Sequence, residues 1–270
     1  MTEQDPSIKR VQAFYDESVQ TEWERLDQHP VEFAVTMRVL QQHLPPAPAR
    51  ILDLGSGPGR YAIALSQLGY QVTLADLSPA NIAFAQQKAE EAGVNLNQTI
   101  IQEATQPLPK DVKDFDAVLL MGPLYHLVTR DKRLAALQNA ISVLKPQGVL
   151  FASFITLFGA LRAVVQYSPD QLEEEWKTLQ YGINRSDLGF TDAYFARIPE
   201  IYSLMAETEA LEQIEILGCE GFSNIVEKSF LETQLVPEVW QHWVDLNLEF
   251  GRHPTALEAS DHILYVARKL

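Results

Sequence analysis

Apolar runs of strand length alternate with helix-like patterns through most of this chain. Residues 51–54 and 72–75 are short apolar runs, and residues 61–68 between them place apolar side chains on one helical face. Further strands are predicted at residues 97–102, 114–121, 149–154, 213–217 and 262–268, and further helices at residues 79–92, 130–144, 199–211 and 237–250. This alternation is typical of an α/β protein with a mainly parallel sheet and helices on both of its faces.

The first apolar run leads into a glycine-rich turn, which reads D-x-G-x-G-x-G from Asp53 to Gly59. Glycine lets a ligand lie against the backbone, and the helix that follows presents free N–H groups at its N-terminus. The second run ends at Asp76, where a carboxylate can accept two hydrogen bonds from a ribose diol. The pattern predicts a site for a nucleotide-like ligand. The alternative is a tight strand-to-helix turn without a ligand.

The glycine spacing distinguishes two kinds of nucleotide site. A dinucleotide fingerprint, G-x-G-x-x-G counted from Gly55, would need a glycine where this chain has Arg60. The observed spacing resembles the first motif of the class I S-adenosylmethionine-dependent methyltransferases, of the type that acts on small molecules. The resemblance extends over about residues 45–155, including the K-P-x-G sequence at residues 145–148, and over the last strand.

This resemblance implies a fold, a cofactor and a set of contacts. The fold is a Rossmann-like, seven-stranded, mostly parallel sheet whose last strand is antiparallel, and the cofactor is S-adenosyl-L-methionine. In such a site the glycine turn lies under the methionine part, and the acid at residue 76 holds the ribose. Glu103 takes the place of an aspartate that contacts the adenine, although a surface acid is the alternative. The implied cofactor contacts are Tyr15, Asp53, Gly55, Ser56, Gly57, Gly59, Asp76, Leu77, Glu103, Ala104, Met121 and Gly122.

The remaining segments are predicted to surround this core within one methyltransferase domain of residues 1–270. Residues 1–45 are predicted to form a helical lid, residues 46–154 the cofactor-binding core, and residues 155–198 a cap insertion. Residues 199–270 complete the core and contain a second insertion at residues 221–261. Loops that leave parallel strands begin at the carboxyl edge of a sheet, so both insertions are expected over the cofactor. A covered pocket favours a small-molecule substrate. Alternatively, aromatic residues such as Tyr15 only pack the helices onto the core.

Two adjacent residues, Tyr125 and His126, are the candidates for the chemistry. They follow the fourth predicted strand and a Gly-Pro turn, at the carboxyl edge of the sheet. Methyl transfer requires positioning, and it requires a base only where the acceptor must lose a proton. An unperturbed histidine titrates near neutrality, so His126 is the candidate base, and Tyr125 could orient the acceptor. The alternative for His126 is a structural histidine that bonds a backbone carbonyl.

Composition argues against several classes of partner. The chain of 270 residues has a formal net charge of −15, which disfavours binding to nucleic acid. Its one cysteine, Cys219, cannot form an intramolecular disulfide and fits a reducing compartment. No apolar run approaches the roughly 20 residues of a membrane span, and the polar N-terminus lacks a signal-peptide core. No cluster of histidine, cysteine and acidic residues has the spacing of metal ligands. We therefore expect a cytoplasmic protein without a metal site or a membrane partner, and its oligomeric state is left open.

Two other functions remain open from the sequence. One is an NAD-dependent oxidoreductase, against which Arg60 argues, because it replaces the third glycine of the dinucleotide fingerprint. The other is a non-catalytic module that binds S-adenosylmethionine, which an intact glycine motif does not exclude.

Overall fold

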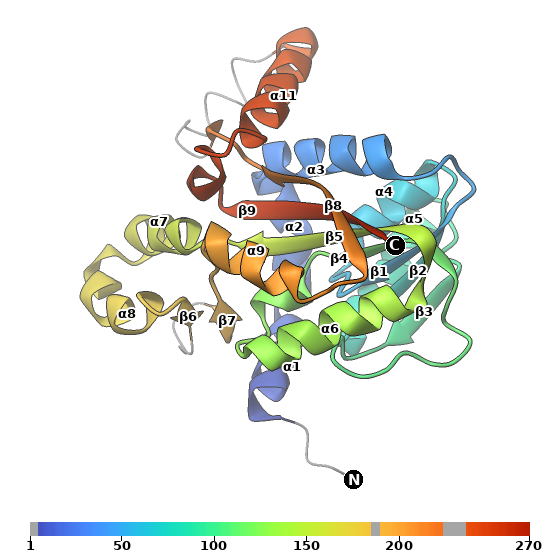
Figure 1. Ribbon diagram of the computed structural model, residues 1–270, viewed down its shortest axis with the longest axis horizontal. Coiled ribbons are helices and arrows are strands. Elements are labelled where there is room, and N and C mark those ends of the chain that lie inside the picture. Colours follow the sequence, from blue (N-terminus) through green and yellow to red (C-terminus); the bar gives the residue numbers. More distant parts are fainter. Residues whose placement is uncertain (1–4, 185–189, 224–235) are drawn as a thin grey trace.

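A seven-stranded sheet forms the centre of the computed structural model, which describes residues 5–184, 190–223 and 236–270 (Figure 1). The strands lie in the order β3-β2-β1-β4-β5-β9-β8. They are β1 (Arg50–Leu54), β2 (Gln71–Asp76), β3 (Gln98–Ile101), β4 (Phe115–Leu120), β5 (Leu144–Ile155), β8 (Leu211–Gly218) and β9 (His262–Lys269). Strands β1 to β5 pair in parallel, and β9 runs antiparallel to both β5 and β8. The predicted α/β fold with its antiparallel last strand is confirmed.

Helices cover both faces of this sheet (Figure 1). One face carries α6 (Arg130–Val143) and α9 (Ile198–Ala206), and the other carries α3 (Pro30–His43), α4 (Arg60–Gln67), α5 (Pro79–Glu91) and α11 (Pro237–Gly251). Successive side chains of a strand point to opposite faces. Leu52 therefore packs in the apolar layer under α6 and α9, whereas Ile51 packs in the layer under α3 and α4. Burial on both faces explains why these strands read as continuous apolar runs.

Two of the predicted boundaries are wrong. The helix predicted over residues 199–211 ends at Ala206, because Leu211 already pairs with Lys269 in the ladder between β8 and β9. The strand predicted to begin at residue 149 begins at Leu144, which pairs with Phe115 before the register shifts. Gln147 has a φ of 65°, in the left-handed region, so the K-P-x-G sequence forms an irregularity inside β5.

The helices that precede the sheet and the segments that follow β5 and β8 lie at the carboxyl edge of the sheet. α1 (Pro6–Glu17) and α2 (Val19–Gln28) contribute side chains to a cavity over the ends of β1, β2 and β4. After β5 the chain forms α7 (Leu157–Tyr167), the 3₁₀ helix η2 (Pro169–Gln171) and α8 (Leu172–Leu179). Within the predicted cap insertion, β6 (Ile183–Asn184) and β7 (Ala193–Tyr194) pair antiparallel. The short helix η1 (Pro123–Tyr125) follows β4, and the short helix η4 (Leu257–Ala259) precedes β9. Parts of the two predicted insertions, residues 185–189 and 224–235, lie outside the described residues.

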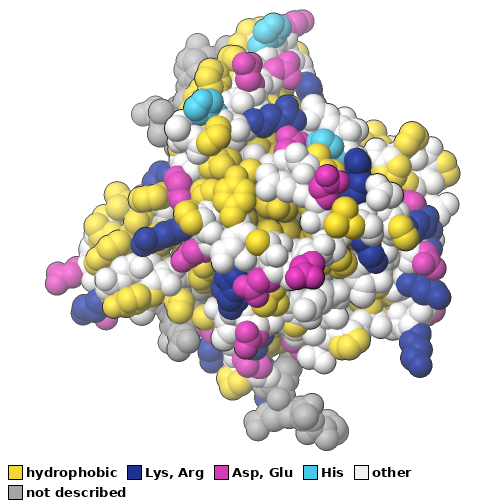
Figure 2. All heavy atoms as spheres, viewed as in Figure 1, with side chains coloured by type: hydrophobic (Ala, Val, Ile, Leu, Met, Phe, Trp, Pro, Cys, Tyr) yellow, Lys and Arg dark blue, Asp and Glu magenta, His cyan; other side chains and the backbone are white. Residues whose placement is uncertain are grey.

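The surface mixes charged side chains of both signs with exposed apolar ones (Figure 2). Apolar side chains are frequent on the left of this view, where α7 and α8 lie. The exposed large apolar residues of these two helices are Phe158, Val165, Tyr167, Leu172 and Trp176. On their inner side, α7 and α8 pack around a small apolar cluster of their own. Among the described helices, none combines the length and the apolar character needed to cross a bilayer.

Candidate active site

The glycine turn between β1 and α4 has a backbone that other residues rarely adopt. Gly55, Gly57 and Gly59 have φ values of 79°, 54° and 88°. A Cβ atom on Gly55 would lie 2.3 Å from Cδ of Pro123, so this glycine allows η1 to approach the turn. On Gly57 the nearest heavy atom to a Cβ would be Cγ of Glu22, at 4.0 Å. This side of the turn therefore offers room for a ligand.

Gly59 faces the opposite side of the turn. A Cβ atom there would lie 2.9 Å from Cβ of Ala85 and 3.1 Å from Cδ1 of Leu74. The residue is buried between α4, α5 and β2, and it does not line the cavity. Its glycine thus permits α4 to pack closely against α5.

The Asp76 carboxylate connects the glycine turn to the start of α5. Its Oδ2 accepts a hydrogen bond of 2.8 Å from the Gly57 N–H, and its Oδ1 accepts from the N–H of Ser78 at 2.9 Å and from Nδ2 of Asn81 at 3.1 Å. Burial raises the pKa of Asp76 although these three bonds favour the charged form. A carboxylate oxygen has two lone pairs. Oδ2 therefore retains one acceptor position for a ligand hydroxyl.

Asp53 carries a buried oxygen without a partner. The residue is 2% exposed, and its Oδ2 has no hydrogen-bond donor among the described residues. Burial raises the pKa of Asp53 to about 7, and the charge of Asp76 adds to this effect. An unpaired buried carboxylate oxygen is costly, and a donor or a cation removes that cost. The site consequently fits a ligand that brings an ammonium group.

A cavity of about 120 Å³ joins these groups under the N-terminal helices. Every residue expected to contact the cofactor lines it except Gly59, and Tyr125 and His126 line it as well. Glu103 is half-buried at the end of β3, where its carboxylate accepts a hydrogen bond from Thr105. α2 contributes Glu22 and Arg25, which the sequence analysis had not singled out.

His126 is held at both ring nitrogens. Its Nδ1 donates to the carbonyl of Asp192 at 3.0 Å, and its Nε2 therefore accepts from the Tyr15 hydroxyl at 2.6 Å. Phe190, from the excursion after β5, packs beside the ring with a centroid distance of 5.4 Å. Burial lowers the pKa of His126 to about 4, which keeps the imidazole neutral. The geometry favours the structural interpretation of His126 over that of a base.

Tyr15 and Tyr125 belong to the same cluster of rings. Tyr15 meets His126 edge-on at a centroid distance of 5.2 Å, and Tyr125 does so at 4.8 Å. The Tyr125 hydroxyl donates to the carbonyl of Met121 at 3.2 Å. Burial raises the pKa values of both tyrosines, so their hydroxyls stay protonated. α1, the turn after β4 and the excursion after β5 thus meet at one place over the cavity.

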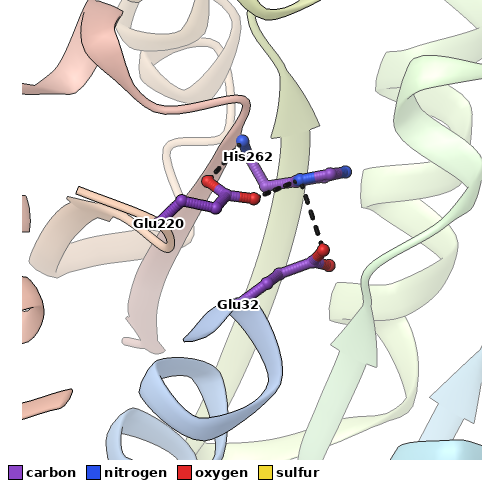
Figure 3. Close-up of side chains that lie close together, drawn as sticks. All are labelled: Glu32, Glu220 and His262. Carbon is purple, nitrogen blue, oxygen red and sulfur yellow. Dashed lines mark hydrogen bonds and ion pairs between the residues drawn. The ribbon is translucent and has the colours of Figure 1, made fainter. Parts of the chain in front are cut away.

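A buried network of charged side chains borders the cavity on the side of α2. Arg25 donates to both carboxylate oxygens of Glu32, at 2.7 and 3.0 Å, and its Nε donates to Glu22 at 3.1 Å. Glu220, after β8, accepts from Nδ1 of His262 at 2.6 Å and from its backbone N–H at 3.0 Å. Figure 3 shows Nδ1 of the His262 imidazole facing both glutamates; it lies 3.6 Å from Glu32.

These charges stabilise one another. Burial disfavours the charged imidazole of His262, but Glu32 and Glu220 outweigh it and raise its pKa to about 9. Burial likewise disfavours the charged form of Glu32, and the charges of Arg25 and His262 outweigh it and lower the pKa of Glu32. The ligand atoms of Glu32, Glu220 and His262 lie within 4.8 Å of one another, close enough to share a metal ion. Spacing along the chain could not show this grouping, because its members come from α3, the segment after β8 and β9.

Comparison with known proteins agrees with this geometry. Residues 51–148 match the family described as Methyltransferase domain. Over these residues the chain is similar to a methyltransferase domain. That domain contains the glycine turn, Asp76, Glu103 and the residues after β4.

The relatives of this methyltransferase domain have different acceptors in their names. A ubiquinone biosynthesis O-methyltransferase of Xanthomonas axonopodis pv. citri is 34% identical over 119 residues, which are 44% of this chain and 48% of that protein. A tRNA 5-carboxymethoxyuridine methyltransferase of Escherichia coli K12 is 37% identical over 124 residues, 46% of each chain. The chain thus spans about half the length of the curated relatives that it matches.

The fold similarity extends further than the sequence match. The magnesium protoporphyrin IX methyltransferase of Synechocystis PCC 6803, solved with bound SAH, superposes with a TM-score of 0.59 over 98% of this chain and all of that one. Their identity is 17%, so the likeness concerns the fold alone.

Proposed function

We propose that this protein transfers a methyl group from S-adenosyl-L-methionine to a small-molecule acceptor. The observation that carries this proposal is the unpaired, buried Oδ2 of Asp53 beside the open face of Gly57 and the carboxylate of Asp76. These groups match a ligand that combines an ammonium group with a ribose. The family match over residues 51–148 supports the same cofactor.

Each part of the cavity has a role in this proposal. Asp53 would hold the ammonium group of the cofactor, the Gly55–Gly57 turn its methionine part, and Asp76 the ribose, and all of these residues line the cavity. Leu77, Glu103 and Ala104 line the far end, where the adenine would lie. When bound, the cofactor supplies a methyl group on a sulfonium, with a neutral thioether as the leaving group. The protein positions the acceptor and excludes water, and positioning contributes roughly 7–11 kcal/mol to such reactions.

Two features favour a small acceptor over a nucleic acid. The net charge of −15 opposes the approach of a phosphate backbone. α1 and α2 also lie over the cavity, and a covered site suits a molecule that can be enclosed.

Calorimetry with purified protein tests the choice of cofactor. We expect S-adenosylmethionine to bind and NAD not to bind, because Arg60 begins α4 where a dinucleotide site needs its third glycine. Binding of NAD without binding of S-adenosylmethionine would contradict the proposal. Transfer of a labelled methyl group to a small molecule would separate an enzyme from a non-catalytic module that only binds the cofactor.

We also propose that α1 and α2 form a lid. α1 is attached through polar contacts of Ser7 and Arg10 with Asp192 and of Asp16 with Ser78, and through its buried side chains Ile8 and Val11. A lid that opens for substrates is less stable than the sheet beneath it. We expect the amide hydrogens of α1 and α2 to exchange faster than those of β4, and to slow when the cofactor binds.

Hydrogen exchange followed by mass spectrometry measures both effects, and α6 serves as the control because it lies outside the cavity. Protection of α1 and α2 that ignores the cofactor would show that these helices only pack against the core.

A further inference from the structure

Glu22 brings a carboxylate to the cavity from α2. Its Oε1 accepts a hydrogen bond of 3.1 Å from Nε of Arg25, whereas its Oε2 accepts none from any residue that the structure describes. This second oxygen is not one of the fully buried polar atoms that lack a partner, so part of its surface is accessible. Because Glu22 lines the cavity, Oε2 is available to a ligand that binds there.

The position of Glu22 corresponds to the middle of the proposed cofactor site. Its Cγ would lie 4.0 Å from a Cβ atom on Gly57, in the turn proposed to carry the methionine part. Gly57 donates its N–H to Asp76, which is proposed to hold the ribose. The sulfur of S-adenosylmethionine joins these two parts of the cofactor, so it would lie beside Glu22.

Electrostatic effects on Tyr125 agree with this placement. Burial raises the pKa of Tyr125, and the charges of Glu22 and Asp76 add to this effect. Tyr125 belongs to η1, directly after β4 and at the carboxyl edge of the sheet. Both carboxylates are therefore within electrostatic reach of the place where the methyl group would be transferred.

Glu22 also adds a negative charge that the proposed cofactor contacts do not use. Arg25 is bonded to Glu22 and Glu32. Arg60, the second arginine among the described lining residues, is paired with Asp27. The three other acids of the lining have roles at the ammonium group, the ribose and the adenine. Burial raises the pKa of Glu22, and the ion pair with Arg25 favours its charged form.

We infer that Glu22 makes the site selective for a cofactor with a positive charge at its sulfur, so that S-adenosylmethionine is preferred over S-adenosylhomocysteine. This inference rests on the proposed methyltransferase function. In the reaction an electron pair of the acceptor atom forms the new bond to the methyl carbon, the C–S bond breaks, and its electron pair stays on sulfur. The sulfonium becomes a neutral thioether, and Glu22 loses the charge that it faced. The lid helix α2 is then held less firmly, which favours release of the product.

Only a contact that differs between the two forms of the cofactor can produce such a preference. Both forms carry the same adenine, ribose, ammonium and carboxylate groups, and these groups would meet the same residues. The forms differ by one methyl group and one positive charge, and a carboxylate in a partly buried site responds to that charge. Because Glu22 belongs to α2, the difference acts directly on the lid.

Calorimetry with three ligands tests the preference. S-adenosylmethionine carries the positive charge, and so does sinefungin, in which a carbon bearing a protonated amine replaces the methylated sulfur. S-adenosylhomocysteine is neutral at this position. In Glu22→Gln the affinity for the two charged ligands should fall roughly tenfold, while the affinity for S-adenosylhomocysteine stays unchanged. Glutamine keeps an oxygen that can accept from Arg25, so the contact within α2 is retained.

Glu24→Gln is the matched control. Glu24 lies on the same helix, is exposed and does not line the cavity, so this variant removes the same charge outside the site. It should bind all three ligands as the wild type does. Glu22→Asp keeps the charge on a shorter side chain, should give an intermediate preference, and covers the case in which Glu22→Gln does not fold.

Hydrogen exchange of α2 provides a second readout. In the wild type, S-adenosylmethionine should slow the exchange of its amide hydrogens more than S-adenosylhomocysteine does, and in Glu22→Gln the two should act equally. Equal protection by both forms in the wild type would overturn the inference.

Two calorimetric results would overturn it as well. An equal loss of affinity for all three ligands in Glu22→Gln would assign Glu22 to a group that they share, such as the ammonium group. Unchanged affinity for the charged ligands would show that Glu22 does not face the sulfur. Failure of the proposed function is a different result, because the wild-type protein would then bind none of the three ligands.

Discussion

Replacing Asp76 with alanine is expected to weaken the binding of S-adenosylmethionine by roughly 1.5–3 kcal/mol, the worth of one hydrogen bond to a charged group. The carboxylate lies at the end of β2, lines the cavity and retains an acceptor position for a ribose hydroxyl. The variant should also be less stable than the wild type, because Gly57, Ser78 and Asn81 lose their acceptor.

Calorimetry measures the affinity, and thermal unfolding without the cofactor measures the stability. Asp16→Asn is the matched control, since Asp16 bonds Ser78 from α1 but does not line the cavity. Cofactor affinity that is unchanged in Asp76→Ala would show that the ribose is held elsewhere.

Replacing Glu32 with alanine is expected to lower the free energy of unfolding by about 3–5 kcal/mol, as when one partner of a buried ion pair is removed. Glu32 is 5% exposed and accepts both hydrogen bonds that Arg25 donates from its two terminal nitrogens. The substitution leaves the guanidinium of Arg25 with Glu22 alone and the imidazole of His262 with Glu220 alone. Urea unfolding measures the loss, and Glu91→Ala, which removes an exposed ion pair with Lys88, should remain close to the wild type.

The same network predicts a pH dependence. The pKa of His262 is raised in the folded state, so its contribution to stability is complete below about pH 6.5, the ordinary histidine value, and is lost as the pH rises through about 9. In Glu32→Gln one of the two charges that raise this pKa is absent, so the alkaline loss of stability should be smaller and should be complete at a lower pH. Identical pH profiles for Glu32→Gln and the wild type would show that Glu32 does not act on His262.

The sequence left open whether His126 is a base or a structural residue. The sequence places Tyr125 and His126 correctly at the carboxyl edge, because they directly follow a buried strand and a Gly-Pro turn. It cannot show that Tyr15 and the carbonyl of Asp192 occupy both ring nitrogens of His126. These partners belong to α1 and to the segment before β7, and only folding brings them to the ring.

The sequence by itself determined the sheet, the glycine turn and the acid at the end of β2. These features are local: apolar runs, glycine spacing and helix caps act within a few residues, and parallel strands then align their carboxyl ends at one edge. The tertiary structure alone decided that Gly59 packs against α5, that Arg25 reaches Glu32 beside the cavity, and that Glu32, Glu220 and His262 meet. Burial and charge pairing between distant segments set these contacts, and neither is encoded in the spacing of residues along the chain.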